Sequence, residues 1–113
     1  MADWVLCKAV RDATSGLVDA DLGHGLIKQR VARPGQGKRG SYRTIIAYRA
    51  KNRAVFLFGF AKNAKADLDA DELKDLIEIG ATWLNANDDA IEMAVDDERL
   101  TEVACDEDEE DAN

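Results

Sequence analysis

Residues 42–49 read Tyr-Arg-Thr-Ile-Ile-Ala-Tyr-Arg, and residues 53–61 read Arg-Ala-Val-Phe-Leu-Phe-Gly-Phe-Ala. Both runs are rich in β-branched and aromatic residues, which fit the pleated and half-buried surface of a strand. The segment between the runs, residues 50–52, has the length of a hairpin connection. The two runs therefore predict an antiparallel pair of strands at the centre of the fold.

The segment upstream of this hairpin predicts a helix and a third strand. Apolar residues at three- and four-residue spacing favour a helix over residues 3–15. The stretch 17–25 is turn-rich and ends in Gly-His-Gly, and residues 26–32 then favour a strand. Residues 33–40 are rich in glycine and are predicted to be a loop that leads into the hairpin.

The segment downstream of the hairpin predicts two helices. A helix is expected to begin at Asp69, because Glu72 completes a capping-box pattern with Asp in place of Ser or Thr. A shorter helix is expected over residues 88–95, and a brief additional strand over residues 100–104. This order of elements predicts an α+β domain: a small antiparallel sheet of three to four strands with helices packed on one face.

The length and composition of the chain exclude several classes of protein. Its 113 residues fit one domain, and 46% hydrophobic with 34% charged residues is a globular rather than a disordered balance. The apolar run 54–58 is far shorter than the roughly 20 residues that cross a bilayer, and no secretory leader opens the chain. Two distant cysteines, Cys7 and Cys105, and the single His24 predict neither a metal site nor a disulfide framework. A cytoplasmic protein with reduced thiols is therefore expected.

Charge is divided unevenly along the chain. Residues 1–65 contain 13 Lys or Arg against four Asp, a net charge of +9, whereas residues 66–113 have a net charge of −17. Such asymmetry is typical of a half that binds a polyanion joined to an acidic segment. Because residues 106–111 are all acidic, we expect a domain over 1–104 and a disordered acidic tail over 105–113. The tail either competes weakly for the polyanion site or only aids solubility.

Basic side chains follow the predicted strands. Alternation places Lys28 and Arg30 on one face of the strand over 26–32. If the three strands are neighbours, five cations converge on one surface: Lys28, Arg30, Arg43, Lys62 and Lys65. A rigid cationic surface suits a phosphodiester, because the transition state for its cleavage carries additional negative charge. The alternative is a solvated sheet face or edge, which basic residues often line.

Two further groups of residues allow contacts to nucleic acid. The loop over 33–40 carries three cations among its glycines: Arg33, Lys38 and Arg39. The loop is either an arm that contacts phosphates or a flexible connection kept soluble by charge; it is not a Walker A loop, because no Gly-Lys-Ser/Thr ends it and no helix follows. Tyr42 and Tyr48 alternate to the same face of their strand, where core packing and base stacking are both open.

Four segments in order form a more specific pattern. They are Gly16-Leu-Val-Asp-Ala-Asp-Leu-Gly23, Leu26-Ile-Lys-Gln-Arg-Val-Ala-Arg-Pro-Gly-Gln-Gly-Lys38, Ser41-Tyr-Arg-Thr-Ile-Ile-Ala-Tyr48 and Phe56-Leu-Phe-Gly-Phe-Ala-Lys-Asn63. Their combination resembles the RelE/HigB-like toxins of bacterial type II toxin–antitoxin systems, over residues 2–103. The family fold is a small antiparallel sheet with helices on one face. Relatives begin with a further strand, so the resemblance implies that this N-terminal strand is missing here.

The resemblance also implies a function. Members of the family are endoribonucleases that use no metal and no cofactor, cut messenger RNA, often on the ribosome, and arrest growth. A cognate antitoxin, usually encoded beside the toxin and often a helix-turn-helix DNA-binding protein, neutralises each of them. The implied partners of this chain are therefore mRNA, the ribosome and an antitoxin in the cytoplasm, and no membrane.

The resemblance assigns roles to individual residues. By position, Lys28 and Arg30 match the basic pair on the second family strand, and Arg43 matches the arginine of the next strand. The implied reaction is attack of a ribose 2′-hydroxyl on the adjacent phosphate, which needs a base, an acid and cations. Arg30 and Arg43 are assigned to the phosphate, and Lys28 or Lys62 to the base or acid. The remaining cations are assigned to RNA binding, with no metal ligand: Arg33, Lys38, Arg39 and Lys65.

Two other functions remain open from the sequence. The same basic sheet is compatible with a non-catalytic RNA- or partner-binding module, an inactive truncated relative of the toxins. The acidic half is compatible with a protein-interaction domain. RNA cleavage that persists with a chelator present distinguishes the toxin from both.

Overall fold

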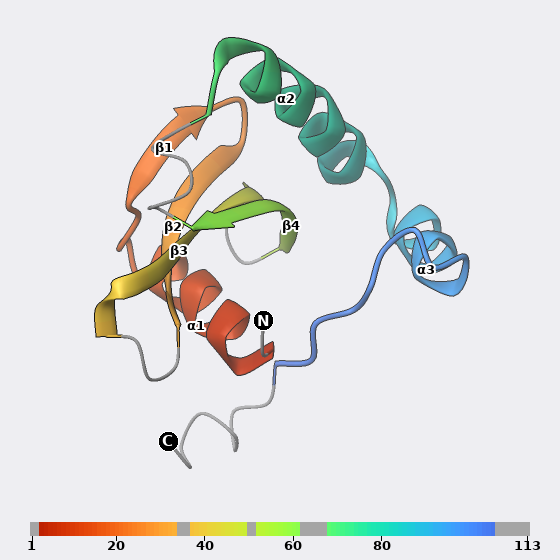
Figure 1. Ribbon diagram of the computed structural model, residues 1–113. Helices are drawn as coiled ribbons and strands as arrows, with labels where there is room; N and C mark the ends of the chain where they lie inside the picture. The colour runs from red at the N-terminus through yellow and green to blue at the C-terminus, as the bar shows by residue number, and fades with distance from the viewer. Residues whose placement is uncertain (1–2, 34–36, 50–51, 62–67, 106–113) are drawn as a thin grey trace.

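The structure is a computed structural model that describes residues 3–33, 37–49, 52–61 and 68–105. Within these ranges seven elements follow one another: α1 (Asp3–Thr14), β1 (Ala20–Gly23), β2 (Leu26–Arg33), β3 (Gly37–Arg49), β4 (Arg53–Ala61), α2 (Ala70–Asn85) and α3 (Asp88–Asp96). The four strands form one antiparallel sheet in the order β1-β2-β3-β4 (Figure 1). The predicted α+β class and the predicted hairpin of β3 and β4 are confirmed.

Two strands differ from the prediction. The turn-rich stretch contains β1, a strand of four residues that pairs with β2 through the turn at Gly23, His24 and Gly25, where φ is 78°, 55° and 80°. Four residues are too few to show a strand pattern in the sequence. β1 is a strand because its backbone pairs with β2. β3 begins at Gly37, which pairs with Arg33, so the predicted loop is shorter than residues 33–40.

Helices cover both faces of the sheet, where the sequence predicted one face. α1 packs Val5, Ala9 and Ala13 against Ile27 and Ile46 on one face. α2 packs Leu76 against a second cluster on the other face, formed by Leu26, Ile45, Ala47 and Phe60. Successive strand residues alternate between the two faces. Near the start of β2 and the end of β3 the residues on both faces are apolar, so a helix packs on each face.

α2 and α3 begin as the sequence predicted. The Asp69 side chain accepts from the Glu72 N–H at 2.8 Å, and the Glu72 side chain accepts from the Asp69 N–H at 3.0 Å, which completes the capping box. α3 follows the N-cap Asn87, whose side chain accepts from the Ala90 N–H at 2.8 Å. Gly80 lets α2 approach the sheet, because a Cβ there would lie 2.8 Å from Leu26 Cδ2.

Residues 97–105 form an irregular segment, which we call the C-terminal strap. The brief strand predicted over 100–104 is wrong, because the strap runs from α3 back to α1 without joining the sheet (Figure 1). The Ala104 N–H donates to Asp3 Oδ2 at 3.2 Å. None of the helices that the structure describes has both the length and the apolar character needed to span a membrane.

The expectation of two reduced thiols is also wrong for this structure. Cys7, buried in α1, and Cys105, at the end of the strap, form a disulfide with a Cα–Cα distance of 5.6 Å. Their separation of 98 residues hides this proximity in the sequence, and only the return of the strap to α1 brings them together. The predicted acidic tail, residues 106–113, lies outside the described residues, so the division into a domain and a tail stays a prediction.

Candidate functional site

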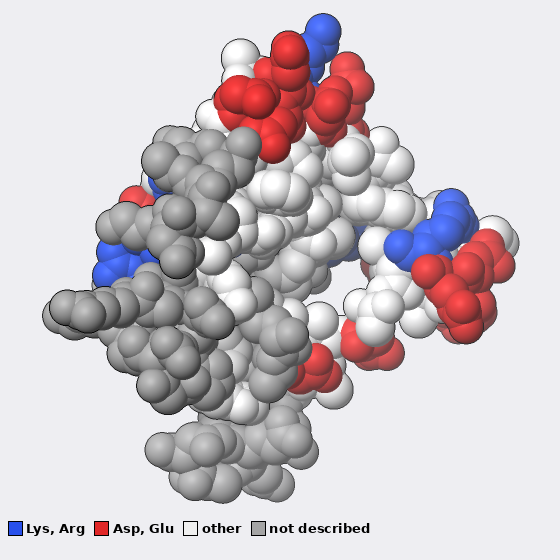
Figure 2. All heavy atoms as spheres, in the orientation of Figure 1, with Lys and Arg blue, Asp and Glu red and all other residues white. Residues whose placement is uncertain are grey.

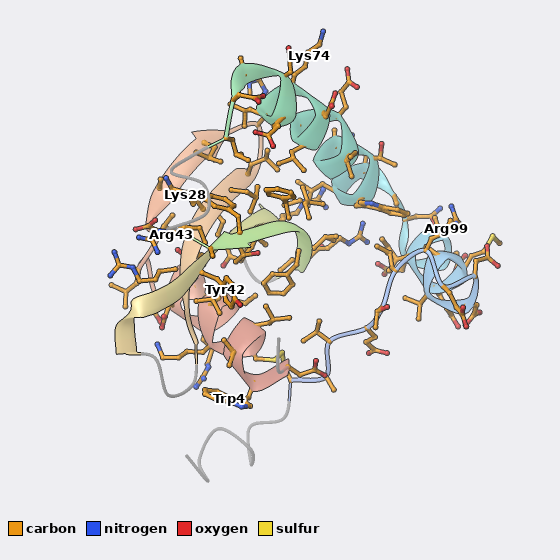
Figure 3. The ribbon with its side chains drawn as sticks, viewed as in Figure 1. Trp4, Lys28, Tyr42, Arg43, Lys74 and Arg99 are labelled. Atoms are coloured by element: carbon orange, nitrogen blue, oxygen red, sulfur yellow. A yellow bond between two sulfur atoms is a disulfide. The ribbon has the colours of Figure 1, made fainter. Side chains whose placement is uncertain are left out.

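Three of the predicted cations lie together on one face of the sheet. Lys28 and Arg30 are two residues apart on β2 and share a face, and the register pairs Arg30 directly with Arg43 on β3. Paired residues on adjacent strands are about 5 Å apart, and residues two positions apart on one strand about 7 Å. Figure 3 shows Lys28 and Arg43 on adjacent strands. We call Lys28, Arg30 and Arg43 the cationic face.

The three side chains differ in their exposure. Arg30 is exposed and Lys28 is half-buried, whereas Arg43 is only 8% exposed. α2 covers the neighbouring end of the same sheet face, where Leu26 pairs with Ala47. The cations therefore lie beside the α2-side core, and the exposed Arg30 lies next to the buried Arg43.

An aromatic pair extends this face onto β4. Phe60 pairs with Arg43 across β3 and β4, and Phe58 pairs with Ile45. The two rings have centroids 5.8 Å apart, and Phe58 is 37% exposed. An exposed aromatic ring beside cations is the combination on which a nucleic-acid base can stack. Phe58 was not among the predicted site residues, although its place between Phe56 and Phe60 in an alternating aromatic strand was a signal.

Tyr42 and Tyr48 lie on the opposite face of the sheet. Both pack against the buried cluster beneath α1. The Tyr48 hydroxyl lies 2.9 Å from Thr14 Oγ1 at the end of α1, and either oxygen can donate. Of the two interpretations that were open for these residues, core packing is the one that the structure supports.

Arg43 is oriented by residues that the sequence analysis did not select. Its Nε lies 3.4 Å from Asp19 Oδ2, and the two side chains are 10% and 29% exposed. The Asp19 N–H donates in turn to the Gln29 side-chain oxygen at 2.8 Å. A buried arginine without a carboxylate would carry a large desolvation penalty, so Asp19 stabilises the buried position of Arg43.

Gln29 connects this ion pair to the core. Its side-chain amide is 3% exposed and donates to the Ala9 and Leu17 carbonyls, each at 2.9 Å. A hydrogen-bonded chain thus runs from α1 through Gln29 and Asp19 to the cationic face. A signal was present in the sequence: Gln29 is the polar member of the alternating set Ile27, Gln29, Val31, whose other two members are apolar.

The structure describes no side chains for the remaining predicted site residues. Arg33 lies at the end of β2, and Lys38 and Arg39 lie within β3 rather than in a loop, described by their backbone. Lys62 and Lys65 lie outside the described residues. The structure thus brings together Lys28, Arg30 and Arg43, and leaves the other five as predictions.

Acidic and basic side chains occupy different parts of the surface. Figure 2 shows carboxylates gathered over α2 and α3, and Lys or Arg beside β1 and β2. His24 is exposed in the turn between β1 and β2. Across the described ranges, no three His, Cys, Asp or Glu side chains group in a way that could hold a metal ion. The positive side chains of the cationic face, Lys28, Arg30 and Arg43, match the charge of a polyanion.

A comparison with protein families gives this arrangement a context. The model of the family described as RelE toxin of the RelE/RelB toxin–antitoxin system matches residues 1–103. The match includes every described element and every residue of the cationic face. Because it extends over nearly the whole sequence, the chain belongs to the RelE toxin family and is the toxin of a toxin–antitoxin system, with a cognate antitoxin as its partner.

Proposed function

We propose that this toxin is a metal-independent endoribonuclease that cleaves messenger RNA on the ribosome in the cytoplasm. The observation that carries the proposal is the direct pairing of Arg30 with Arg43 across two strands, with Lys28 beside them. Three cations fixed on a sheet match the charge of a phosphodiester and of its more anionic transition state. The antitoxin that opposes it is proposed to be a helix-turn-helix DNA-binding protein encoded beside the toxin.

The proposed reaction is an internal transfer within the RNA. The ribose 2′-oxygen loses its proton to a base and forms a bond to the adjacent phosphorus. The bond from phosphorus to the 5′-oxygen breaks, and an acid returns a proton to that oxygen. The products are a 2′,3′-cyclic phosphate and a 5′-hydroxyl, and no metal or cofactor takes part.

Roles in this reaction follow from position and charge. Arg30 and Arg43 are assigned to the non-bridging oxygens of the phosphate, because a guanidinium offers several donors in a fixed plane. Lys28 or Lys62 is assigned to the base or the acid. Phe58 is proposed to stack on a base that flanks the scissile phosphate.

The other predicted cations extend the proposed RNA contact. Arg33, Lys38 and Arg39 lie on β2 and β3 beyond the Arg30–Arg43 pair, at the end of the sheet away from α2. Together with Lys65 they are assigned to phosphates next to the scissile one. Contacts of this kind are independent of sequence and weaken as salt is raised.

Cleavage of an end-labelled mRNA by the purified toxin, with EDTA present and with or without ribosomes, tests the proposal. Arg30→Gln removes an exposed cation of the cationic face, and Lys74→Gln removes an exposed cation on α2 as a matched control (Figure 3). Loss of one group that stabilises transition-state charge lowers the rate by roughly 100-fold. We expect a loss of this order in Arg30→Gln and an unchanged rate in Lys74→Gln.

The alternative outcomes separate the remaining functions. RNA that is bound without any product would support the non-catalytic binding module. RNA that is neither bound nor cut, with ribosomes present as well as absent, would contradict both and favour a protein-interaction domain. Equal rates in the two variants would remove the cationic face from the mechanism.

A further inference from the structure

The Cys7–Cys105 disulfide takes no part in the proposed reaction, and it joins two segments near opposite ends of the described chain. Cys7 lies in α1 and is 4% exposed, whereas Cys105 ends the strap and is exposed. Helical spacing places Cys7 about 200° around α1 from Val5 and from Ala9, which pack against the sheet. The Cys7 sulfur therefore faces away from the sheet and toward the strap, where it lies 3.5 Å from the Ala104 carbonyl oxygen.

The strap depends on this disulfide for its attachment to α1. Figure 1 shows the strap passing from α3 to the start of α1. A second polar contact between the strap and α1 is the bond from the Ala104 N–H to Asp3 Oδ2 at 3.2 Å. That bond is exposed, so water can replace either partner at little cost. Opening the disulfide therefore removes the strong link between the end of the strap and α1.

The same helix supports the cationic face. Two residues after Cys7, the Ala9 carbonyl accepts from Gln29 Nε2 at 2.9 Å. The Gln29 side-chain oxygen accepts from the Asp19 N–H at 2.8 Å, and Asp19 Oδ2 lies 3.4 Å from Arg43 Nε. A continuous series of contacts thus connects α1, the helix that holds the disulfide, to the buried arginine of the cationic face.

The two sulfurs differ in their access to a reductant. In the cytoplasm, where the proposed function operates, thiol pools reduce most disulfides, and those that form are usually transient and redox-sensing. Exchange requires a thiolate to reach one of the two sulfurs, and Cys105 is the exposed partner of the buried Cys7. α1 keeps its packing against the sheet when the bond opens. Closure is then intramolecular, with a high effective concentration of one thiol near the other.

We infer that the Cys7–Cys105 disulfide is a reversible redox switch, which a dithiol reductant opens at Cys105 and which controls how firmly α1 supports the cationic face. With the switch closed, the strap fixes the first turns of α1, and Arg43 keeps its orientation. With the switch open, the strap and these turns become mobile, and the orientation of Arg43 is less fixed. The effect on RNA cleavage rests on the proposed function, whereas the opening itself does not.

The exchange consists of two thiolate attacks. One thiolate of the reductant attacks Cys105 Sγ, the bond between Cys105 and Cys7 breaks, and Cys7 leaves as a thiolate that takes a proton from water. The second thiolate of the reductant attacks the mixed disulfide and releases Cys105, which is protonated in turn. The dithiol gives up two electrons and becomes a disulfide, and the protein gains two thiols. A disulfide oxidant runs the same steps in reverse.

Exchange on the full chain without RNA tests the switch itself. The oxidised toxin is treated with 2-mercaptoethanol and quenched with acid, and peptide mass spectrometry is expected to find the mixed disulfide on Cys105. Dithiothreitol should open the bond and glutathione disulfide should close it again, with the circular dichroism spectrum retained throughout. Hydrogen exchange is expected to become faster on reduction in residues 97–105 and in the first turns of α1, and to stay unchanged in the β3–β4 hairpin.

Three results of these measurements would overturn the switch. A mixed disulfide on Cys7 would contradict opening at the exposed sulfur. Loss of the circular dichroism spectrum on reduction would show that the bond holds the whole fold together and does not switch a folded protein. Exchange in α1 that reduction leaves unchanged would show that the strap does not fix this helix.

Cleavage of RNA by the oxidised and the reduced toxin then measures the effect on the site. We expect kcat to be at least about threefold lower in the reduced toxin, with KM nearly unchanged, which is the size of effect that a contact network transmits. Cys105→Ser should match the reduced toxin and ignore reductant, whereas the control Lys74→Gln should respond as the parent does. In Asp19→Asn the contact with Arg43 is already altered, so the response of kcat to reductant is expected to disappear.

The outcomes separate the switch from the ribonuclease proposal. Cleavage with equal kcat in both redox states, or a redox response that survives in Asp19→Asn, would overturn the link from the disulfide to Arg43. No cleavage in either state would contradict the ribonuclease proposal, and the exchange measurements, made without RNA, would still decide the switch.

Discussion

At the scale of single residues, the cationic face depends on two side chains that carry no positive charge. Arg43 is buried, and its Nε–Asp19 ion pair at 3.4 Å is positioned through the Asp19 N–H and the Gln29 amide. Gln29 in turn is bonded to the carbonyls of Ala9 and Leu17. The orientation of a proposed catalytic arginine is therefore set by α1 and the core on the far face of the sheet.

Asp19→Asn tests this positioning role. The substitution keeps the size of the side chain but removes its charge, so Arg43 is expected to lose its fixed orientation. A small misplacement of a catalytic group lowers a rate by roughly 10- to 100-fold, and we expect kcat for RNA cleavage to fall by this much with KM nearly unchanged. Asp21→Asn on β1 is the control, because Asp21 bonds only to the Gly23 N–H of its own turn within the described contacts. Equal kcat values for the two variants would contradict the positioning role.

Gln29→Leu is expected to destabilise the fold by about 2–4 kcal/mol, because two carbonyls and one N–H lose a buried partner. Thr44→Val is the matched control: Thr44 is paired with Gln29 across the strands, is also buried, and donates a single bond to the Phe58 carbonyl at 3.0 Å. Its loss is expected to change stability by about 1 kcal/mol. Urea unfolding measures both. A Gln29→Leu protein as stable as Thr44→Val would show that the buried amide does not anchor α1 to the sheet.

At the scale of elements, the position of the C-terminal strap depends on contacts with a distant part of the chain rather than on its own sequence pattern. It has no regular secondary structure, and it is held by the bond from Ala104 to Asp3 and by the disulfide to α1. These contacts join the two ends of the described chain. The strap also lines a hollow beside β4 and α3, so its attachment affects the shape of that hollow as well as stability.

Reduction of the Cys7–Cys105 disulfide is expected to destabilise the protein. Closing a loop of about 100 residues lowers the entropy of the unfolded chain by an amount worth roughly 4–5 kcal/mol. Urea unfolding with and without reductant measures the loss, and hydrogen exchange is expected to become faster in residues 97–105. Cys105→Ser should reproduce the reduced protein and no longer respond to reductant. Unfolding midpoints that are identical in the oxidised and reduced protein would contradict a stabilising disulfide.

At the scale of the whole molecule, opposite charges are separated along the chain and over the surface. The first 65 residues have a net charge of +9 and the rest −17, and Figure 2 shows the carboxylates over α2 and α3. The proposed RNA site follows this division, because it lies on the cationic face of β2 and β3.

Deletion of residues 106–113 tests whether the acidic tail takes part in this division. A polyanion tethered near a cationic site has an effective concentration on the order of millimolar, so a competing tail predicts tighter RNA binding in the truncated protein. The gain is expected at low salt and should vanish near physiological salt, where the Debye length is about 8 Å. Binding titrations at two salt concentrations measure it. An affinity that truncation leaves unchanged at low salt would show that the tail only aids solubility.

Features encoded by neighbouring residues could be predicted from the sequence, and those that depend on distant contacts could not. The β3–β4 hairpin and the Asp69–Glu72 capping box are local, and both were predicted. The strand β1, the disulfide and the placement of helices on both faces arise from pairing and packing between distant segments. In the site, alternation along β2 predicted the shared face of Lys28 and Arg30. The Asp19–Arg43 ion pair was missed, because it joins a residue just before β1 to a residue on β3, 24 positions apart in the sequence.

The proposed chemistry is tested most directly by cleavage of an RNA that carries a single 2′-deoxy nucleotide at the scissile position. With EDTA present, the toxin is expected to cut the all-ribose RNA to a 2′,3′-cyclic phosphate and a 5′-hydroxyl. The substituted RNA should remain intact at that position while it still binds, because the attacking hydroxyl is the one group removed. Cleavage of the 2′-deoxy RNA at the same position, or loss of all cleavage when EDTA is added, would contradict a metal-independent ribonuclease on the cationic face.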